Sequence, residues 1–175
     1  ILTDGRQPIG NGIGPVLEIK DVISVLRRED NCPKDLEAKS LLLAGTILEI
    51  AGKENKGHGL SRAKQILDNG LALKKFKEII EAQKGSLKEF PEAPFKKTIY
   101  SSQTGKVIEI NNKRINGLAR TAGCPLDKLS GVYLYKHLSD KVKKGEPLFT
   151  VYSESSPKLK QALDYMKDNM PIRVG

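Results

Sequence analysis

A glycine-rich loop at the start of the chain carries the residues best placed for chemistry. Asp4 follows a short apolar stretch, so it lies where a strand would end and a loop begin, the position at which open α/β sheets bind ligands. Arg6 could bind a phosphate group through two parallel hydrogen bonds. Two alternatives stay open: Asp4 could instead stabilise the turn through nearby backbone N–H groups, and Arg6 could be an exposed loop cation.

Three glycines close this loop directly before a predicted helix, in the segment Gly10–Gly14. Backbone N–H groups at a helix N-terminus can cradle a phosphate, so the segment could line a substrate cleft. Its spacing fits neither the dinucleotide-binding fingerprint nor a Walker loop. A turn without ligand contact is the alternative.

The histidines and cysteines form no catalytic or metal-binding pattern. His58 lies in a glycine-flanked turn and His137 follows a predicted strand, and neither has a nucleophile or carboxylate spaced as a relay, so both are expected at the surface. Cys32 and Cys124 are isolated, which predicts reduced, structural thiols. We therefore expect no catalytic residue and no metal site within the chain.

Helices must position this loop. Pro15 suits the first helical position, and apolar residues at helical spacing after it predict a helix that ends near Arg28. Three more helices are expected at about 33–52, 61–69 and 73–83, and Ser61 is predicted to cap the helix at 61–69. A buried apolar stripe is predicted along the second helix, at Leu36, Leu43, Ile47 and Ile50.

The pattern changes after residue 84. Pro91 and Pro94 mark a linker, and short β-branched and aromatic stretches follow it. Strands are predicted at 96–100, 105–110, 131–135 and 148–152, and helices at 113–122 and 157–168. We thus expect an α+β chain with a mostly helical domain at 1–84, a linker at 85–94 and a small α+β domain at 95–175.

Composition and charge restrict the class of protein. The 175 residues are 38% hydrophobic and contain no apolar run of the roughly 20 residues that cross a bilayer and no signal peptide, which predicts a cytoplasmic globular protein. The chain starts at Ile1 rather than Met, as a truncated product would. After Pro94 it carries 15 basic and 7 acidic residues, an excess that favours phosphate-bearing partners or nucleic acid unless these lysines are only solvated.

Three stretches together resemble the thymidine phosphorylase / pyrimidine-nucleoside phosphorylase family, and within it most closely archaeal AMP phosphorylase. The first is Thr3-Asp4-Gly5-Arg6-Gln7-Pro8-Ile9-Gly10 with the helix after it. The second is the helical hairpin 63–85, which ends in Gln83-Lys84-Gly85. The third includes Gly105-Lys106-Val107, Ile115-Asn116-Gly117-Leu118-Ala119 and 140–148. The stretches keep the family order over nearly the whole chain.

The resemblance implies a fold and an activity. The fold would be the helical remnant of an α/β domain followed by a barrel-sandwich, biotinyl-like domain. The intact parent would cleave the N-glycosidic bond of a nucleoside or nucleotide with inorganic phosphate as co-substrate. It would need no cofactor, form a homo-oligomer, and bind neither membrane nor nucleic acid. Its substrate cleft would include the loop residues Asp4, Gly5, Arg6, Gln7 and Gly10.

The chain also departs from the family. The Lys/Ser segment and Gly-Gly-Thr-x-Asp-Lys loop that hold phosphate, and the Ser/Lys pair that holds the base, do not occur here. In the family they precede the Thr-Asp-x-x-Gln-Pro loop, so they would lie upstream of Ile1. We therefore expect this chain alone to be inactive.

The substrate remains open among several alternatives. Bacterial thymidine phosphorylases usually carry Met where this loop has Gly5. The space that Gly leaves favours a purine base, so the resemblance implies AMP as the substrate, with CMP and UMP as further candidates. Gly5 could instead serve only a backbone angle. A thymidine or pyrimidine-nucleoside phosphorylase is the second candidate. The third is a non-enzymatic basic module that binds RNA or protein, in which four tyrosines would be either stacking platforms or core: Tyr100, Tyr133, Tyr135 and Tyr152.

Overall fold

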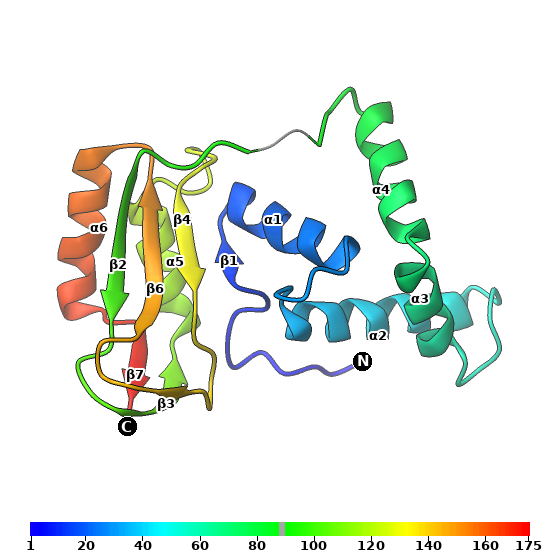
Figure 1. The fold of residues 1–175 in the computed structure, drawn as a ribbon, viewed down its shortest axis with the longest axis horizontal. Helices are drawn as coiled ribbons and strands as arrows, with labels where there is room; N and C mark the ends of the chain where they lie inside the picture. Colours follow the sequence, from blue (N-terminus) through cyan, green and yellow to red (C-terminus); the bar gives the residue numbers. More distant parts are fainter. Residues whose placement is uncertain (88–89) are drawn as a thin grey trace. The chain divides into compact units, whose positions relative to one another are not determined.

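The computed structural model describes residues 1–87 and 90–175, and it divides the chain into two compact units (Figure 1). The first unit combines Ile1–Ile19 with Phe90–Gly175, and the second is Lys20–Glu89. The helices and antiparallel sheets confirm the α+β class predicted from the sequence. The division differs from the expected domains at 1–84 and 95–175, and part of the expected linker 85–94 lies outside the described residues.

Four helices form the first half of the chain, as the sequence predicted: α1 Pro15–Leu26, α2 Lys34–Ile50, α3 Gly59–Asp68 and α4 Leu71–Ala82. Their ends differ from the predicted ones by about two residues. The predicted cap of α3 is wrong, because Ser61 lies inside the helix, where its hydroxyl donates a hydrogen bond to the His58 carbonyl. The Ser61 hydroxyl thus donates to the carbonyl of the N-cap residue His58 and does not accept from the backbone N–H groups of the first helical turn.

The apolar stripe predicted along α2 is wrong over most of its length. Leu43, Ile47 and Ile50 are 43%, 65% and 82% exposed. The side of α2 that meets α3 carries Gly45, and a Cβ on Gly59 would lie only 2.1 Å from the Gly45 carbonyl oxygen. The two helices therefore cross closely at a pair of glycines, and this contact does not bury Leu43, Ile47 or Ile50.

The first unit contains two antiparallel sheets. The larger has the strand order β1-β4-β6-β2, in which β1 is Gly12–Ile13, β4 Gly131–Leu134, β6 Pro147–Ser153 and β2 Phe95–Tyr100. The smaller has the order β5-β3-β7, in which β5 is Lys141–Val142, β3 Gly105–Ile110 and β7 Ile172–Val174. Helices α5 (Asn112–Thr121) and α6 (Ser156–Asp168) complete the unit, and their N-caps are Asn111 and Ser155.

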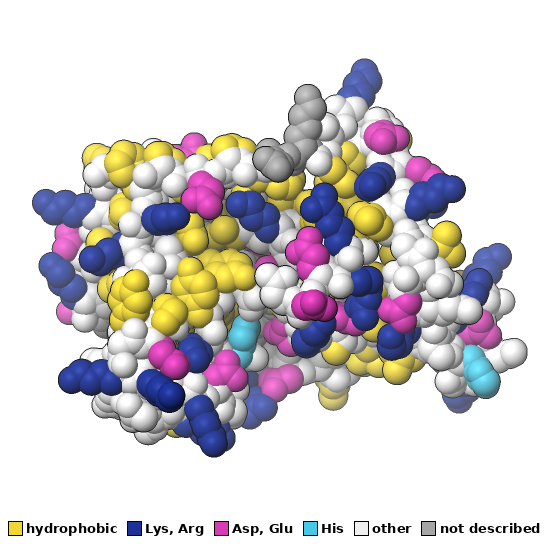
Figure 2. Space-filling model, in the orientation of Figure 1, with side chains coloured by type: hydrophobic (Ala, Val, Ile, Leu, Met, Phe, Trp, Pro, Cys, Tyr) yellow, Lys and Arg dark blue, Asp and Glu magenta, His cyan; other side chains and the backbone are white. Residues whose placement is uncertain are grey.

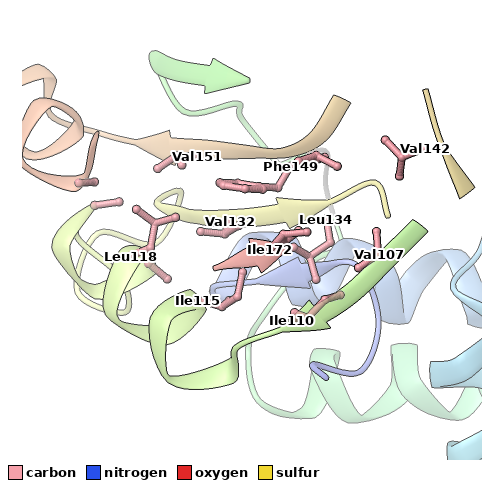
Figure 3. Packing of buried hydrophobic residues seen from close by; sticks show 14 residues of the cluster. Val107, Ile110, Ile115, Leu118, Val132, Leu134, Val142, Phe149, Val151 and Ile172 are labelled. Carbon is pink, nitrogen blue, oxygen red and sulfur yellow. The ribbon is translucent and has the colours of Figure 1, made fainter. Parts of the chain in front are cut away.

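The core of this unit lies between α5, α6 and the sheets (Figure 3). Ile115 and Leu118 of α5 are fully buried against the inward residues of β4 and β6. Most of β6 is buried: Leu148, Phe149 and Val151 belong to this core, whereas Tyr152 is only half-buried. Burial of these aliphatic and aromatic groups is the main stabilising contribution to the unit.

Strand β1 was not predicted, because the glycine-rich segment 1–14 was expected to be an irregular loop. It pairs with β4 in the register Gly12 to Tyr133 and Ile13 to Val132, and the Leu134 N–H donates to the Asn11 carbonyl at 2.8 Å. A Cβ on Gly131 would lie 2.1 Å from the Ile13 carbonyl oxygen. Glycine at 131 thus permits a close backbone approach, and this pairing joins residues 1–19 to residues 90–175, the part of the first unit that we call the C-terminal unit. Strands β5 and β7 were also missed, since they span only two and three residues.

A substitution at Gly131 should test this close approach. We expect Gly131→Ala to destabilise the chain by roughly 1–3 kcal/mol, because the new methyl group must displace the Ile13 carbonyl or distort β4. Thermal unfolding followed by circular dichroism measures the loss. Gly5→Ala is the matched control, since a Cβ there meets no heavy atom within 4 Å. Equal melting temperatures for Gly131→Ala and the unaltered chain would contradict the packing described here.

Candidate functional site

The loop that holds the predicted site residues is fixed to the C-terminal unit at three points. The Asn112 side chain donates to the Gly5 carbonyl at 2.9 Å, and the Leu138 N–H donates to Gln7 Oε1 at 2.7 Å. His137 Nε2 lies 2.8 Å from Asn11 Oδ1. The side chains of Asn112 and His137 and the backbone N–H of Leu138 therefore hold a loop that is more than one hundred residues away in sequence.

Asp4 and Arg6 bind each other. Asp4 Oδ1 accepts the Arg6 backbone N–H at 3.0 Å, and the guanidinium donates to both carboxylate oxygens at 2.7–3.1 Å. The hydrogen bond and charge of Asp4 raise the pKa of the exposed Arg6 guanidinium above its ordinary value. This is the turn-stabilising arrangement that the sequence left open for Asp4. It engages the face of Arg6 that a phosphate would otherwise occupy.

The N-terminus of α1 already uses donors that an anion would need. The Gly14 N–H donates to Glu18 Oε1 at 2.9 Å, and the Val16 N–H donates to the Lys128 carbonyl at 3.2 Å. Pro15 contributes no N–H. Gly10 is buried and has φ +72°, so it serves a turn that favours glycine. The geometry is that of a closed turn, the alternative to a phosphate cradle.

Gly5 lies in the exposed part of the loop. A Cβ at this position would meet nothing within 4 Å, and Gly5 is not among the glycines with positive φ. The alternative that Gly5 serves only a special backbone angle therefore has no support in the structure. The space beside Gly5 is thus open to a Cβ atom within this chain.

One histidine and both cysteines have the environment or state that the sequence predicted, and one histidine does not. His58 is exposed as predicted, whereas His137 is half-buried and holds Asn11, a role that sequence reasoning missed. Both cysteines are unpaired thiols, and burial together with the nearby Glu18 carboxylate raises the pKa of Cys124. Within residues 1–87 and 90–175, no cluster of His, Cys, Asp and Glu could hold a metal ion.

No helix among the described residues reaches the length and apolar character of a membrane span.

Three of the tyrosines lie together on the outer face of the larger sheet. The rings of Tyr133 and Tyr135 contact each other edge to face, with their centroids 5.3 Å apart. The Tyr135 hydroxyl is 3.0 Å from Thr150 Oγ1. Burial and the neighbouring Tyr135 raise the pKa of Tyr152. Figure 2 shows hydrophobic side chains gathered over β4 and β6 on this face. These rings thus lie outside the core, and hydrogen bonds hold two of them: Tyr133 accepts from Asn11 Nδ2, and Tyr135 pairs with Thr150.

The comparisons with known proteins agree with this architecture. Residues 106–173 match the family model described as the pyrimidine nucleoside phosphorylase C-terminal domain. A protein of Legionella pneumophila (strain Corby), named "Putative thymidine phosphorylase", is 46% identical over 174 residues, which cover 99% of this chain and 34% of the relative. Proteins of the same name from Ralstonia nicotianae and Bradyrhizobium diazoefficiens are 44% identical over 165 residues and 48% identical over 157 residues. These alignments cover 94% and 90% of this chain, and 32% and 31% of the relatives.

The matched residues and the α+β fold therefore define this part of the chain as a C-terminal domain of the nucleoside phosphorylase class. The chain belongs to the thymidine/pyrimidine-nucleoside phosphorylase family, as part of its C-terminal region. This confirms the family resemblance read from the sequence. The chain spans about a third of the length of the curated relatives it matches.

A phosphate titration should distinguish a closed turn from an anion site. Because the N–H groups of Gly14 and Val16 are already hydrogen-bonded, we expect their amide NMR signals not to move when inorganic phosphate is added to this chain at millimolar concentration. Sodium chloride at matched ionic strength is the control. Saturable shifts confined to residues 10–16 would show instead that the helix N-terminus binds phosphate.

Proposed function

We propose that this chain works as the C-terminal part of a longer nucleoside or nucleotide phosphorylase. The observation that carries the proposal is the coincidence of two features: similarity over nearly the whole chain to relatives named as thymidine phosphorylases, and a Thr-Asp-x-x-Gln-Pro loop fixed to the C-terminal unit by Gln7 and Asn11. The chain would supply the scaffold and one wall of the substrate cleft.

The proposed reaction is phosphorolysis. An oxygen of inorganic phosphate forms a bond to the anomeric carbon while the bond from that carbon to the base nitrogen breaks, and the base leaves with a proton. The product is a sugar 1-phosphate, or ribose 1,5-bisphosphate when the substrate is a nucleoside monophosphate. Such a reaction proceeds by charge stabilisation and positioning, without a covalent intermediate or a cofactor. The groups that bind phosphate and base would come from outside this chain.

The substrate that we favour is AMP, and the reason is the open space at Gly5. A purine exceeds a pyrimidine by a fused ring, so a wall without a side chain accepts it more easily. The names of the relatives support thymidine as well, and a thymidine or pyrimidine-nucleoside phosphorylase is the second candidate. The family resemblance further suggests that the intact protein is a cytoplasmic homo-oligomer.

The isolated chain should show no phosphorolysis. The reason is that the groups proposed to bind phosphate and base would come from outside this chain, and within it Arg6 already donates to Asp4 and the Gly14 N–H to Glu18. The assay measures phosphate-dependent release of adenine or thymine by purified chain, with a full-length protein containing it as the positive control. Release of free base by the chain alone would contradict the proposed division of roles.

The purine preference can be tested with Gly5→Met in the full-length protein. If Gly5 forms a wall of the base pocket, overpacking of about 1–3 kcal/mol should lower the ratio of kcat/KM for AMP to kcat/KM for a pyrimidine nucleotide roughly 5- to 150-fold. Because the position is open in this chain, the same substitution should leave the chain's melting temperature unchanged. Equal losses on both substrates would remove the reason for preferring AMP.

A further inference from the structure

The loop that carries the candidate site residues is held from one short segment of the C-terminal unit. His137 and Leu138 are neighbours, and they bind Asn11 and Gln7, which are four residues apart. The intervening residues of the loop are thus held between two hydrogen bonds that come from adjacent positions. We infer that His137 is a positioning residue for the substrate-cleft loop, an inference that rests on the proposed function.

The hydrogen bonds around His137 define which ring nitrogen carries the proton. Asn11 Nδ2 donates to the Tyr133 hydroxyl at 3.2 Å, so Oδ1 is the Asn11 atom that faces the imidazole. His137 Nε2 must therefore be the donor, at 2.8 Å. Nδ1, which is buried, has no hydrogen-bond partner among the described residues. We call Asn11, Tyr133 and His137 the clasp.

The segment that carries His137 is itself rigidly held. The His137 N–H donates to Asp140 Oδ2 at 2.7 Å, and the Asp140 N–H returns a hydrogen bond to the His137 carbonyl at 3.0 Å. The Ser139 N–H donates to the Val107 carbonyl at 2.9 Å, and Val107 is a core residue of β3. The clasp is therefore connected to the core through short, consecutive contacts.

A loop fixed in this way has lost its conformational freedom before any substrate arrives. Pre-ordering of groups that contact a ligand removes an entropic cost from binding and from the reacting complex. Gly10, which lies between the two hydrogen bonds, is buried and has φ +72°, so this part of the loop adopts a turn that favours glycine. Loss of the clasp should thus loosen the loop without removing any group that contacts substrate.

The test compares His137→Leu, which cannot donate, with His137→Gln, whose side-chain amide can. In this chain, hydrogen exchange of the Leu138 amide, which donates to Gln7, reports the loop directly. We expect roughly 5- to 100-fold faster exchange in His137→Leu, recovery in His137→Gln, and no change in the control His58→Leu, which alters the exposed histidine of the other unit. Asn11→Ala removes the same hydrogen bond from the opposite partner and serves if His137→Leu does not fold.

Activity of the full-length protein provides the second readout. In the same variants, kcat/KM should fall with His137→Leu and recover with His137→Gln, while His58→Leu leaves it unchanged. Unaltered exchange in both His137→Leu and Asn11→Ala would overturn the inference. Faster exchange with unchanged kcat/KM would also overturn it, since the loop would then be held without serving the substrate. Absence of phosphorolysis in the unaltered full-length protein would instead overturn the proposed function itself.

Discussion

The pairing of β1 with β4 is the interaction on which the rest of the site depends. Two residues, Gly12 and Ile13, attach the N-terminal segment to a sheet whose other strands lie more than eighty residues later. Ile13 packs against the main core, so burial of its side chain supports the backbone pairing. The arrangement requires glycine at position 131, because a larger residue there would collide with the Ile13 carbonyl oxygen.

The attachment has a consequence for the chemistry of the loop. Once β1 is in the sheet, Asn11 meets His137, Gln7 meets Leu138, and the start of α1 meets the Lys128 carbonyl. Each contact occupies a polar group of the loop or of the start of α1. These polar groups of the loop are consequently hydrogen-bonded within the chain, as the proposed role of a cleft wall requires.

The sequence predicted most of the secondary structure for identifiable physical reasons. Helical spacing of apolar residues located α1 and α2, and capping and glycine signals located α3 and α4. Short stretches of β-branched and aromatic residues between turn residues located β3 and β6 almost to the residue. The stripe on α2 failed because periodicity finds an apolar face but not its partner, and the α2–α3 crossing at Gly45 and Gly59 is visible only in three dimensions. The family assignment came from motif order rather than from periodicity.

The candidate site was less predictable than the fold. The loop itself was identified, and the turn-forming role of Asp4 was among the alternatives. Strand β1 was missed because glycines normally weaken strands, whereas here Gly131 allows the backbones of β1 and β4 to approach, and Gly12 allows β1 to lie against Leu17 of α1. The role of His137 depends on a contact with Asn11 across 126 positions, and no local pattern in the sequence carries that information.

The most direct test of this account is native-state hydrogen exchange at Leu134 and Val16, measured at increasing denaturant. Their N–H groups donate to Asn11 and Lys128, so they report whether the N-terminal segment is integral to the C-terminal unit. If it is, both amides should exchange only through the same opening as the core amides of β6, with the same dependence on denaturant. Exchange of Leu134 and Val16 at low denaturant, well before the β6 amides, would show that the segment detaches independently and would contradict the account.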